Sequence, residues 1–210
     1  IARAIEADIE TIIAASTGNA GAAMACVAAS VGKKAVIIAP RSAPPAKVAQ
    51  LLTFGAKVVL VDGTYDQAFD LSIEASDELG WYNRNTGYNP YTVEGKKTAG
   101  LEIWEQVLLN RDQFDQNMTV FIPVGDGNIL SGVAKGFADL LALGWIERLP
   151  RLVGVQAEGS AAIFNAFTAG KDVIEPVSAK TVADSISVDL PRDGLRALKR
   201  VKQSGGYFLT

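Results

Sequence analysis

The sequence of 210 residues contains no histidine and only one cysteine, Cys26. The lack of histidine excludes Ser-His-Asp and Cys-His nucleophile systems and removes the usual imidazole ligands of metals, so we expect no metal site. A single cysteine cannot form an internal disulfide, which argues against an extracellular protein, and we expect Cys26 to be a small core residue. Chemistry must therefore use lysine, carboxylates, hydroxyls, backbone dipoles or a cofactor, and a cofactor is favoured.

Long apolar runs and basic clusters are also lacking. No stretch approaches the roughly 18 apolar residues that cross a bilayer, and no signal-peptide pattern opens the sequence, so we expect a cytoplasmic protein with no membrane partner. The formal net charge is −3, and basic residues cluster only in pairs such as Lys33-Lys34 and Lys96-Lys97. This pattern argues against nucleic acid and leaves a small molecule as the expected partner.

Short apolar runs alternate with segments of helical spacing along the whole sequence. We expect strands at residues 11–15, 35–39, 57–61, 119–124, 152–156 and 205–209, and helices at 2–9, 22–31, 44–55, 65–79, 93–109, 129–143, 161–169 and 194–202. This alternation is typical of parallel sheets with helices on both faces, so the fold class is α/β. The polar loop 83–90 is the expected domain seam. Because the chain begins and ends inside this pattern, we expect a piece of a longer protein.

A glycine-rich turn, Gly125-Asp126-Gly127-Asn128-Ile129, follows one of these strands and opens a helix. Free N–H groups and the positive helix end converge there, which predicts an anion site. A dinucleotide site is disfavoured, because Leu130 occupies the third glycine position of its fingerprint and Glu147 does not end a strand. The alternative, glycines that only make a turn, stays open. We expect the Asp126 side chain to point away or to accept from a nearby N–H group.

A second loop, Ser16-Thr17-Gly18-Asn19, also lies between a strand and a helix. Two hydroxyls, an amide and the N–H groups of a helix N-terminus suit a carboxylate. An ordinary capped helix start explains the same residues equally well. Among the lysines, Lys97 stands one helical turn after Glu94, which predicts an ion pair within the helix.

Taken together and in this order, the motifs resemble the fold-type II pyridoxal-phosphate enzymes, and within them the threonine synthase family most closely. The residues that carry the resemblance are Ser16-Thr17-Gly18-Asn19, Asn89-Pro90, Glu94-Gly95-Lys96-Lys97-Thr98, Pro123-Val124-Gly125-Asp126-Gly127-Asn128, Leu149-Pro150-Arg151 and Ser204-Gly205-Gly206. The resemblance implies two three-layer α/β domains with mainly parallel sheets, like the tryptophan synthase β subunit, with pyridoxal 5′-phosphate between them. Residues 13–92 would form the smaller mobile domain, residues 1–12 and 93–210 the larger one, and the protein would be a homodimer.

The resemblance also implies a role for each matched residue. Gly125, Asp126, Gly127, Asn128 and Ile129 would hold the cofactor phosphate through backbone N–H groups. Asn19 would bind the 3′-oxygen of the cofactor ring and lie beside the substrate, whose α-carboxylate would be bound by Ser16, Thr17 and the N–H group of Ala20. Lys96 stands where the family often has glutamine and would bring a positive charge to the phosphate of the substrate.

The implied reaction, which belongs to threonine biosynthesis, is a lyase reaction that converts O-phospho-L-homoserine and water into L-threonine and phosphate. The sequence departs from the family at three points. In the family the Schiff-base lysine lies before the Ser-Thr-Gly-Asn loop, but no lysine precedes Ser16 here. The resemblance therefore implies that this lysine lies before Ile1 and that these residues alone are inactive. Thr92 stands where an arginine usually helps to hold the phosphate of the substrate, and the glycine loop is one residue shorter than in several family members.

Three alternatives remain open. One is a threonine or serine dehydratase, although dehydratases often have histidine where this chain has Ala20. Another is a cysteine-synthase-like β-replacement enzyme. The third, from a different class, is a catalytically inactive fragment or binding module that keeps both loops.

Overall fold

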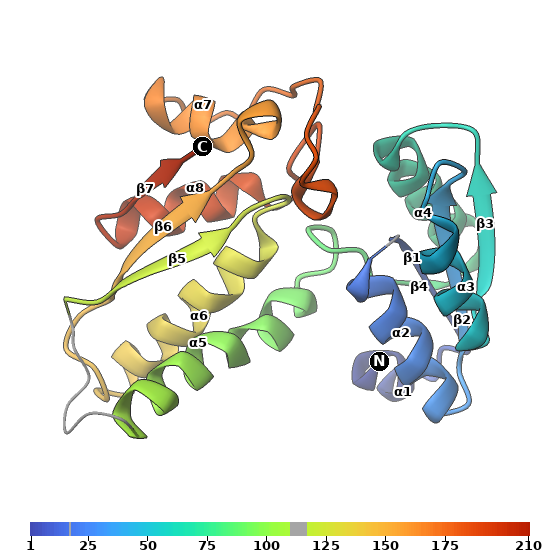
Figure 1. The fold of residues 1–210 in the computed structure, drawn as a ribbon. Coiled ribbons are helices and arrows are strands. Elements are labelled where there is room, and N and C mark those ends of the chain that lie inside the picture. The colour runs from blue at the N-terminus through green and yellow to red at the C-terminus, as the bar shows by residue number, and fades with distance from the viewer. Residues whose placement is uncertain (17, 110–116) are drawn as a thin grey trace. The chain divides into compact units, whose positions relative to one another are not determined.

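The computed structural model describes residues 1–16, 18–109 and 117–210 (Figure 1). By its internal contacts the chain divides into two compact units, Ile1–Asn85 and Thr86–Thr210. This boundary falls inside the polar loop 83–90. The extent of a mobile domain, residues 13–92, stays a prediction, and each unit is described by itself below.

Unit 1 is built on a four-stranded parallel sheet with the order β3-β2-β1-β4. The strands are β1 (Thr11–Ala15), β2 (Lys34–Pro40), β3 (Lys57–Val61) and β4 (Tyr82–Asn83), and the helices are α1 (Ala2–Glu6), α2 (Asn19–Ser30), α3 (Pro45–Thr53) and α4 (Tyr65–Leu79). The chain first moves outward from β1 to β3 and then returns to the other side of β1. Between β1 and β4 the direction of winding therefore reverses, and ligands of open α/β sheets bind at the strand ends beside such a point.

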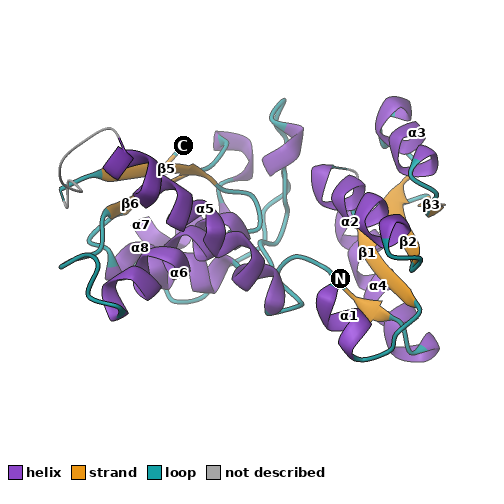
Figure 2. Ribbon diagram, turned by 90° about the horizontal axis from the view of Figure 1, so that it is seen from below, coloured by secondary structure: helices purple, strands orange, loops and turns teal. Residues whose placement is uncertain are grey.

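Helices cover both faces of this sheet, which gives unit 1 three layers (Figure 2), and apolar side chains fill the space between the layers. Ile12 and Ala14 of β1 face one core, with side chains from α1, α2 and α3. Ile13 and Ala15 face the other core, with Ala68 and Phe69 of α4. Alternate residues of one strand serve opposite cores, so both faces must be apolar, and this explains the continuous apolar run of β1.

Unit 2 contains a three-stranded parallel sheet with the order β5-β6-β7. Its elements are α5 (Tyr91–Leu109), β5 (Thr119–Pro123), α6 (Asn128–Ala142), β6 (Arg151–Val155), α7 (Ala162–Thr168), α8 (Gly194–Gln203) and β7 (Tyr207–Leu209), with short 3₁₀ turns at Glu158–Ser160 and Asp184–Ile186. Its core joins Ile122, Leu152 and Phe208 of the sheet to apolar side chains of α6, α7 and α8. This core fixes the start of α6 beside the start of α8.

Helices α5 and α6 pack closely because glycines remove the side chains between them. A Cβ atom built on Gly100 would lie 2.5 Å from the carbonyl oxygen of Val133, and one on Gly136 would lie 2.4 Å from that of Lys97. The predicted ion pair is confirmed, since Lys97 Nζ lies 3.1 Å from Glu94 Oε2, and the same ammonium lies 3.1 Å from Asp139 Oδ2 on α6. The pair therefore also links the two helices.

The structure confirms the α/β class and the parallel sheets, and it corrects two details. Cys26 is exposed on α2, so its expected place in the core was wrong. The short strand β4 lies at the start of the polar loop 83–90, where no strand was expected. Within the described ranges, no helix is long and apolar enough to span a bilayer.

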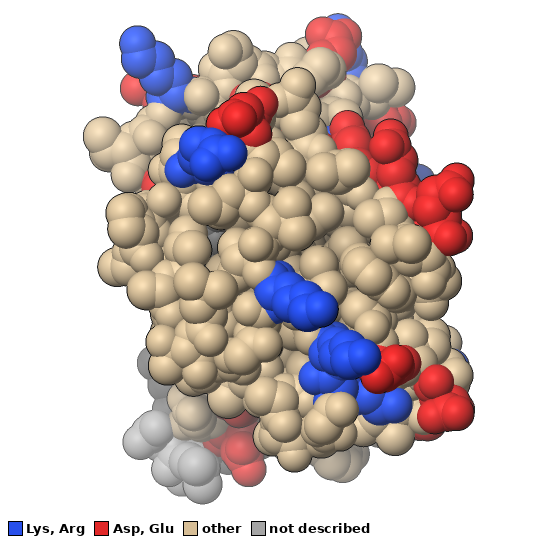
Figure 3. All heavy atoms as spheres, turned by 90° about the vertical axis from the view of Figure 1, so that its right-hand side faces the viewer, with Lys and Arg blue, Asp and Glu red and all other residues tan. Residues whose placement is uncertain are grey.

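On the face shown in Figure 3, several acidic side chains lie together along the upper right edge. Lysine and arginine side chains lie mainly in the lower part and at the upper left, among many uncharged residues. In the described part of the chain, no three potential metal-ligating side chains come together.

Candidate functional site

The start of α6 presents a row of free backbone donors. Gly127 is the N-cap of this helix, with φ of 90°, and no side chain caps the helix. The Ser131 N–H group donates to the Gly127 carbonyl at 3.0 Å. Within residues 1–16, 18–109 and 117–210, we find no acceptor for the N–H groups of Gly127, Asn128, Ile129 and Leu130. Four orphan donors at the positive end of a helix form a site for an anion.

The glycine turn is held from the other side by residues 192 and 193, which directly precede α8. The Asp193 N–H group donates to the Asp126 carbonyl oxygen at 3.0 Å, and the Arg192 N–H group donates to Asp126 Oδ1 at 3.2 Å. The Asp126 side chain therefore accepts from a nearby N–H group, as the sequence predicted. Asp126 faces α8 with its carboxylate, so only its backbone remains for an anion.

Close packing explains why glycine is required at the turn. A Cβ atom built on Gly127 would lie 2.8 Å from Cβ of Ala197 and 3.1 Å from the Asp193 carbonyl oxygen. The positive φ of 90° adds strain for any L-residue. A Cβ atom on Gly125 would lie 3.1 Å from Cα of Ile186. Gly127 is thus needed by the fold itself, in addition to any role beside a ligand, whereas a side chain at Gly125 would require Ile186 to shift by a few tenths of an ångström.

A buried acid, Asp193, lies beneath the turn. Its side chain oxygen Oδ2 accepts from Nδ2 of the buried Asn128 amide at 3.2 Å. Burial raises the pKa of Asp193, while the hydrogen bond from Asn128 and the charges of Arg196 and Lys96 oppose that rise. The Asn128 side chain is therefore turned toward Asp193, and its own Oδ1 is buried without a partner among the described residues.

Lys96 lies on α5 close to this region. A Cβ atom built on Gly132, in the second turn of α6, would lie 2.5 Å from Cβ of Lys96. The Lys96 charge also lowers the pKa of Asp193, so its ammonium acts on the same local field. Lys96 thus lies beside the second turn of α6 in unit 2, the helix that the glycine turn opens. Its assignment to the phosphate of the substrate stays a prediction.

The loop after β1 in unit 1 is organised by a serine hydroxyl. Ser16 is buried, and its Oγ accepts from the N–H groups of Gly18 at 3.3 Å and Gly21 at 3.0 Å. Gly18 is the N-cap of α2 and has no side-chain cap. Ser16 thus holds the turn, and its hydroxyl proton has no acceptor among the residues that the structure describes.

Asn19 and Ala20 form the first turn of α2. Their N–H groups have no acceptor among the residues that the structure describes, and the Asn19 side chain is exposed. Ser16, Asn19 and Ala20 therefore lie together at the carboxyl end of β1, beside the reversal point of the sheet. Thr17, the other residue assigned to this loop, lies outside the described residues.

Two functional features were missed from sequence. Asp193 stands alone in a long irregular segment, and no spacing links it to Asn128. Asn85 lies in the polar loop 83–90, where nothing in the sequence marks it, yet its Oδ1 accepts from the Ala15 N–H group at 2.7 Å. Asp193 and Asn85 are distant in sequence from the loops that they contact, so only the tertiary fold brings them there.

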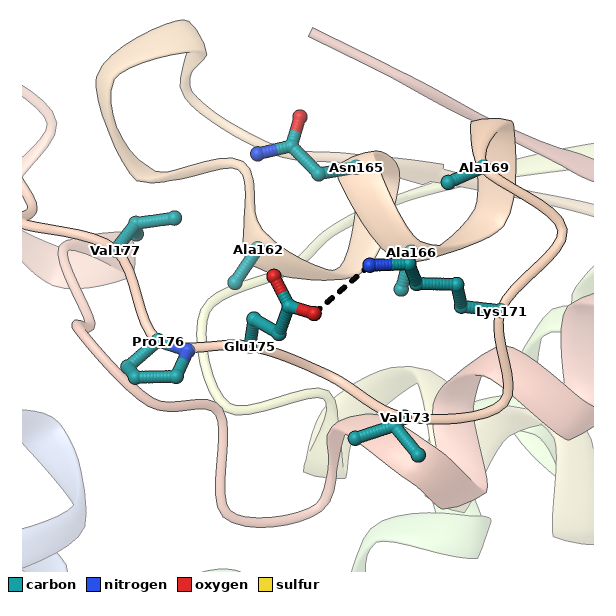
Figure 4. A pocket seen from close by; sticks show the side chains of 9 residues that line it. All are labelled: Ala162, Asn165, Ala166, Ala169, Lys171, Val173, Glu175, Pro176 and Val177. Carbon is teal, nitrogen blue, oxygen red and sulfur yellow. Dashed lines mark hydrogen bonds and ion pairs between the residues drawn. The ribbon is translucent and has the colours of Figure 1, made fainter.

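A separate hollow of about 230 Å³ lies beside α7 in unit 2 (Figure 4). It is lined by Ala162, Asn165, Ala166, Ala169, Lys171, Val173, Glu175, Pro176 and Val177. Lys171 Nζ pairs with Glu175 Oε1 at 2.8 Å, and both side chains are more than half exposed. The hollow contains none of the predicted site residues, so it is not the candidate site.

Residues 1–210 match, over their whole length, the profile of the family described as pyridoxal-phosphate dependent enzyme. The chain belongs to this family. The fold-type II resemblance is thereby confirmed, and pyridoxal 5′-phosphate is confirmed as the cofactor. The glycine turn fits this cofactor, because a phosphate would supply acceptors for the four orphan N–H groups at the start of α6.

Three similar curated proteins are threonine synthases. The chain is 36% identical over 209 residues to that of Methanocaldococcus jannaschii, covering 99% of this chain and 50% of the relative. It is 35% identical over 208 residues to that of Methanosarcina acetivorans, covering 98% and 50%. It is 34% identical over 209 residues to that of a Synechocystis strain, covering 99% and 51%. The chain thus spans about half the length of the curated relatives it matches.

Solved structures support the fold. Threonine deaminase isoform 2 from Solanum lycopersicum matches with a TM-score of 0.76 at 26% identity, over 96% of this chain and 52% of that one. Maize serine racemase matches with a TM-score of 0.72 at 27% identity, over 92% and 56%. A pyridoxal 5′-phosphate-dependent aspartate racemase matches with 0.79 at 18% identity, over 99% and 60%, which supports the fold alone.

Proposed function

We propose that the whole protein is a threonine synthase-like lyase that converts O-phospho-L-homoserine and water into L-threonine and phosphate. The observation that carries this proposal is the 36% identity to a threonine synthase over 99% of the chain. The two helix starts with unpaired N–H groups, at α2 and α6, support it. Because the chain spans half of that relative, the activity is proposed for the whole protein. We also propose a cytoplasmic homodimer, as the sequence led us to expect.

In this proposal the start of α6 binds the phosphate of the cofactor. The donors are the N–H groups of Gly127, Asn128, Ile129 and Leu130, and the turn at Gly125 and Asp126 shapes the approach. The positive end of α6 stabilises the dianion. Neither Asp126 nor Asn128 uses its side chain for the anion, because both side chains are bonded to the segment before α8.

The loop of unit 1 binds the amino acid substrate. The N–H group of Ala20 and the hydroxyl of Ser16 donate to the α-carboxylate, with Thr17 as a further hydroxyl, and this orients the amino acid. Asn19, exposed in the first turn of α2, donates its side-chain amide to the 3′-oxygen of the cofactor ring. We assign the covalent attachment of the cofactor to none of residues 1–210.

The bound cofactor supplies an electron sink that stabilises a carbanion next to the amino group of the substrate. The residues of this chain supply binding and orientation. Thr92 stands where an arginine that binds the phosphate of the substrate is usual in the family. In this proposal the Lys96 ammonium takes the place of that positive charge. An ammonium is a single point charge and not a bidentate fork, so we expect a looser hold on this phosphate than arginine gives.

The test is a side-by-side assay of the whole protein supplied with pyridoxal 5′-phosphate. We expect phosphate release and L-threonine from O-phospho-L-homoserine, and little turnover of threonine or O-acetylserine. Turnover of threonine would favour a dehydratase, and turnover of O-acetylserine would favour a β-replacement enzyme. A protein that takes up no pyridoxal 5′-phosphate would contradict the proposal as a whole and favour a binding module.

A further inference from the structure

The carboxyl end of β1 is joined to the end of β4 by a buried side chain. Strand β4 pairs with β1 at only two positions, and the last rung is the Arg84 N–H group donating to the Ile13 carbonyl at 2.9 Å. Beyond this rung the backbone leaves β1, and the Ala15 N–H group loses its strand partner. Oδ1 of Asn85 accepts from that N–H group at 2.7 Å and so replaces the missing rung.

Asn85 is itself held by a network of neutral polar groups. Its Nδ2 donates to Ser72 Oγ, and Ser72 Oγ donates to the Phe69 carbonyl at 2.6 Å, both on α4. The Asn85 N–H group donates to Oδ1 of Asn83 at 2.8 Å. Asn83 Nδ2 in turn donates to the Ser72 carbonyl at 3.1 Å and to Ser76 Oγ at 3.2 Å. Asn85 is 1% exposed, so every bond it makes is sheltered from water.

Burying this network costs free energy, because its amides and hydroxyls give up their hydrogen bonds to water. Burying amides and hydroxyls is unfavourable unless each of them finds a partner, and a fully satisfied network fixes one geometry. The geometry fixed here is that of Ala15, the residue directly before Ser16. Ser16 then holds Gly18 and Gly21 through its hydroxyl, so the loop inherits the position of Ala15.

The place of Asn85 in the chain gives this contact a further consequence. Asn85 is the last residue of unit 1, and Thr86 begins unit 2. The chain therefore leaves unit 1 at the residue whose side chain fixes the loop after β1.

We propose that Asn85 is a positioning residue that sets the conformation of Ser16 and of residues 18–20, and thereby their affinity for the substrate carboxylate. This inference rests on the proposed function for the carboxylate, whereas the link between Asn85 and the loop stands on geometry alone. Asn85 has no role at the cofactor phosphate, which belongs to the start of α6.

The experiment measures amide hydrogen exchange of residues 15–22 in the whole protein and in two variants. Asn85→Ala removes the acceptor of the Ala15 N–H group. The matched control, Ser76→Ala, removes a bond at the far end of the same network and leaves Ala15 untouched. We expect Asn85→Ala to speed exchange in residues 15–22 by about tenfold or more, and Ser76→Ala to leave it unchanged. Equal exchange in the two variants would overturn the proposal.

Two further readouts keep the outcome decisive. In the unchanged protein the Ala15 N–H group should exchange slowly although it has no strand partner; fast exchange there contradicts the proposal even if Asn85→Ala does not fold. Asn85→Ala should also weaken amino acid binding about tenfold while the affinity for pyridoxal 5′-phosphate stays the same. If the loop exchanges faster but amino acid binding is unchanged, the positioning role stands and the proposed carboxylate site falls.

Discussion

The two anion loops occupy the same place in their units, after a parallel strand and at the start of a helix, yet they are held in different ways. The loop after β1 is fixed by neutral side chains, Ser16 and Asn85. The turn after β5 is fixed by the carboxylates of Asp126 and Asp193 and by Gly127, which packs against Ala197 of α8. At Gly18 in the first loop, no described atom lies within 4 Å of a built Cβ atom. At Gly127 in the second, a built Cβ atom would lie 2.8 Å from Cβ of Ala197.

This difference matches the ligands that we propose for the two loops. A phosphate bound only by backbone N–H groups needs a turn of fixed shape, because no side chain can adjust to it. A carboxylate bound by hydroxyls, an amide and a helix start can be adjusted through side-chain rotamers. The turn in unit 2 should therefore tolerate a side chain at Gly127 poorly, and the loop in unit 1 should tolerate one at Gly18 well.

Gly127→Val is the strongest test of this contrast. The β-branched side chain meets Ala197 and Asp193 and must adopt a positive φ, so we expect a loss of about 2–4 kcal/mol in the free energy of unfolding. The control, Gly18→Ala, enters open space at φ −111° and should cost less than about 1 kcal/mol. Denaturant unfolding measures both variants. Similar losses at the two glycines would break the comparison.

Gly127→Val is not a suitable test of cofactor binding. Because Gly127→Val disturbs the packing against α8, weaker cofactor binding by this variant would not separate a blocked phosphate from a displaced turn. Tests of the phosphate site must therefore leave the backbone of the turn intact.

Lys96→Met is expected to have a smaller effect and to act on binding. Loss of the ammonium should raise KM for O-phospho-L-homoserine about tenfold, with little change in cofactor affinity. Steady-state kinetics of the whole protein measure this change. Lys97→Met is the control, since Lys97 is paired with Glu94 and Asp139 and should affect stability by less than about 1 kcal/mol and KM not at all. An equal rise of KM in both variants would remove Lys96 from the site.

Asp193→Asn tests how the buried carboxyl group beneath the turn makes the free energy of unfolding depend on pH. Because burial raises the pKa of Asp193, the folded state keeps this proton to a higher pH than the unfolded state does. The free energy of unfolding therefore loses a contribution as pH rises from the unfolded pKa through the folded one. Asparagine keeps the shape and does not titrate, so the variant should gain stability relative to the original protein over that window. Urea unfolding at several pH values measures the gain, and parallel curves would contradict it.

The sequence was sufficient for elements with strong patterns. The apolar runs of β1 and β3 and the helical spacing of α4 were each predicted with the bounds that the structure has. Strand β4 was missed because two residues, Tyr82 and Asn83, show no periodicity. Cys26 was misplaced because α2 is composed mostly of small residues, so its sequence does not mark which side faces the sheet.

The candidate site was predictable only as two separate loops. Their residue types and their place before helices are local properties, so Ser16, Asn19 and the turn at 125–129 could be found from sequence. The groups that hold the loops are distant in the chain, as Asp193 is from Asn128 and Asn85 is from Ala15. A single polar residue in an irregular segment carries no pattern, and its partner is chosen by the tertiary fold.

The central claim is that the start of α6 binds the phosphate of the cofactor through its backbone. The most direct measurement is an NMR titration of the backbone amides of the whole protein with pyridoxal 5′-phosphate and, in parallel, with pyridoxal, which lacks the phosphate. We predict large shifts of the N–H signals of Gly127, Asn128, Ile129 and Leu130 with pyridoxal 5′-phosphate and small shifts with pyridoxal. Equal shifts with both compounds, or none at these four residues, would contradict the account.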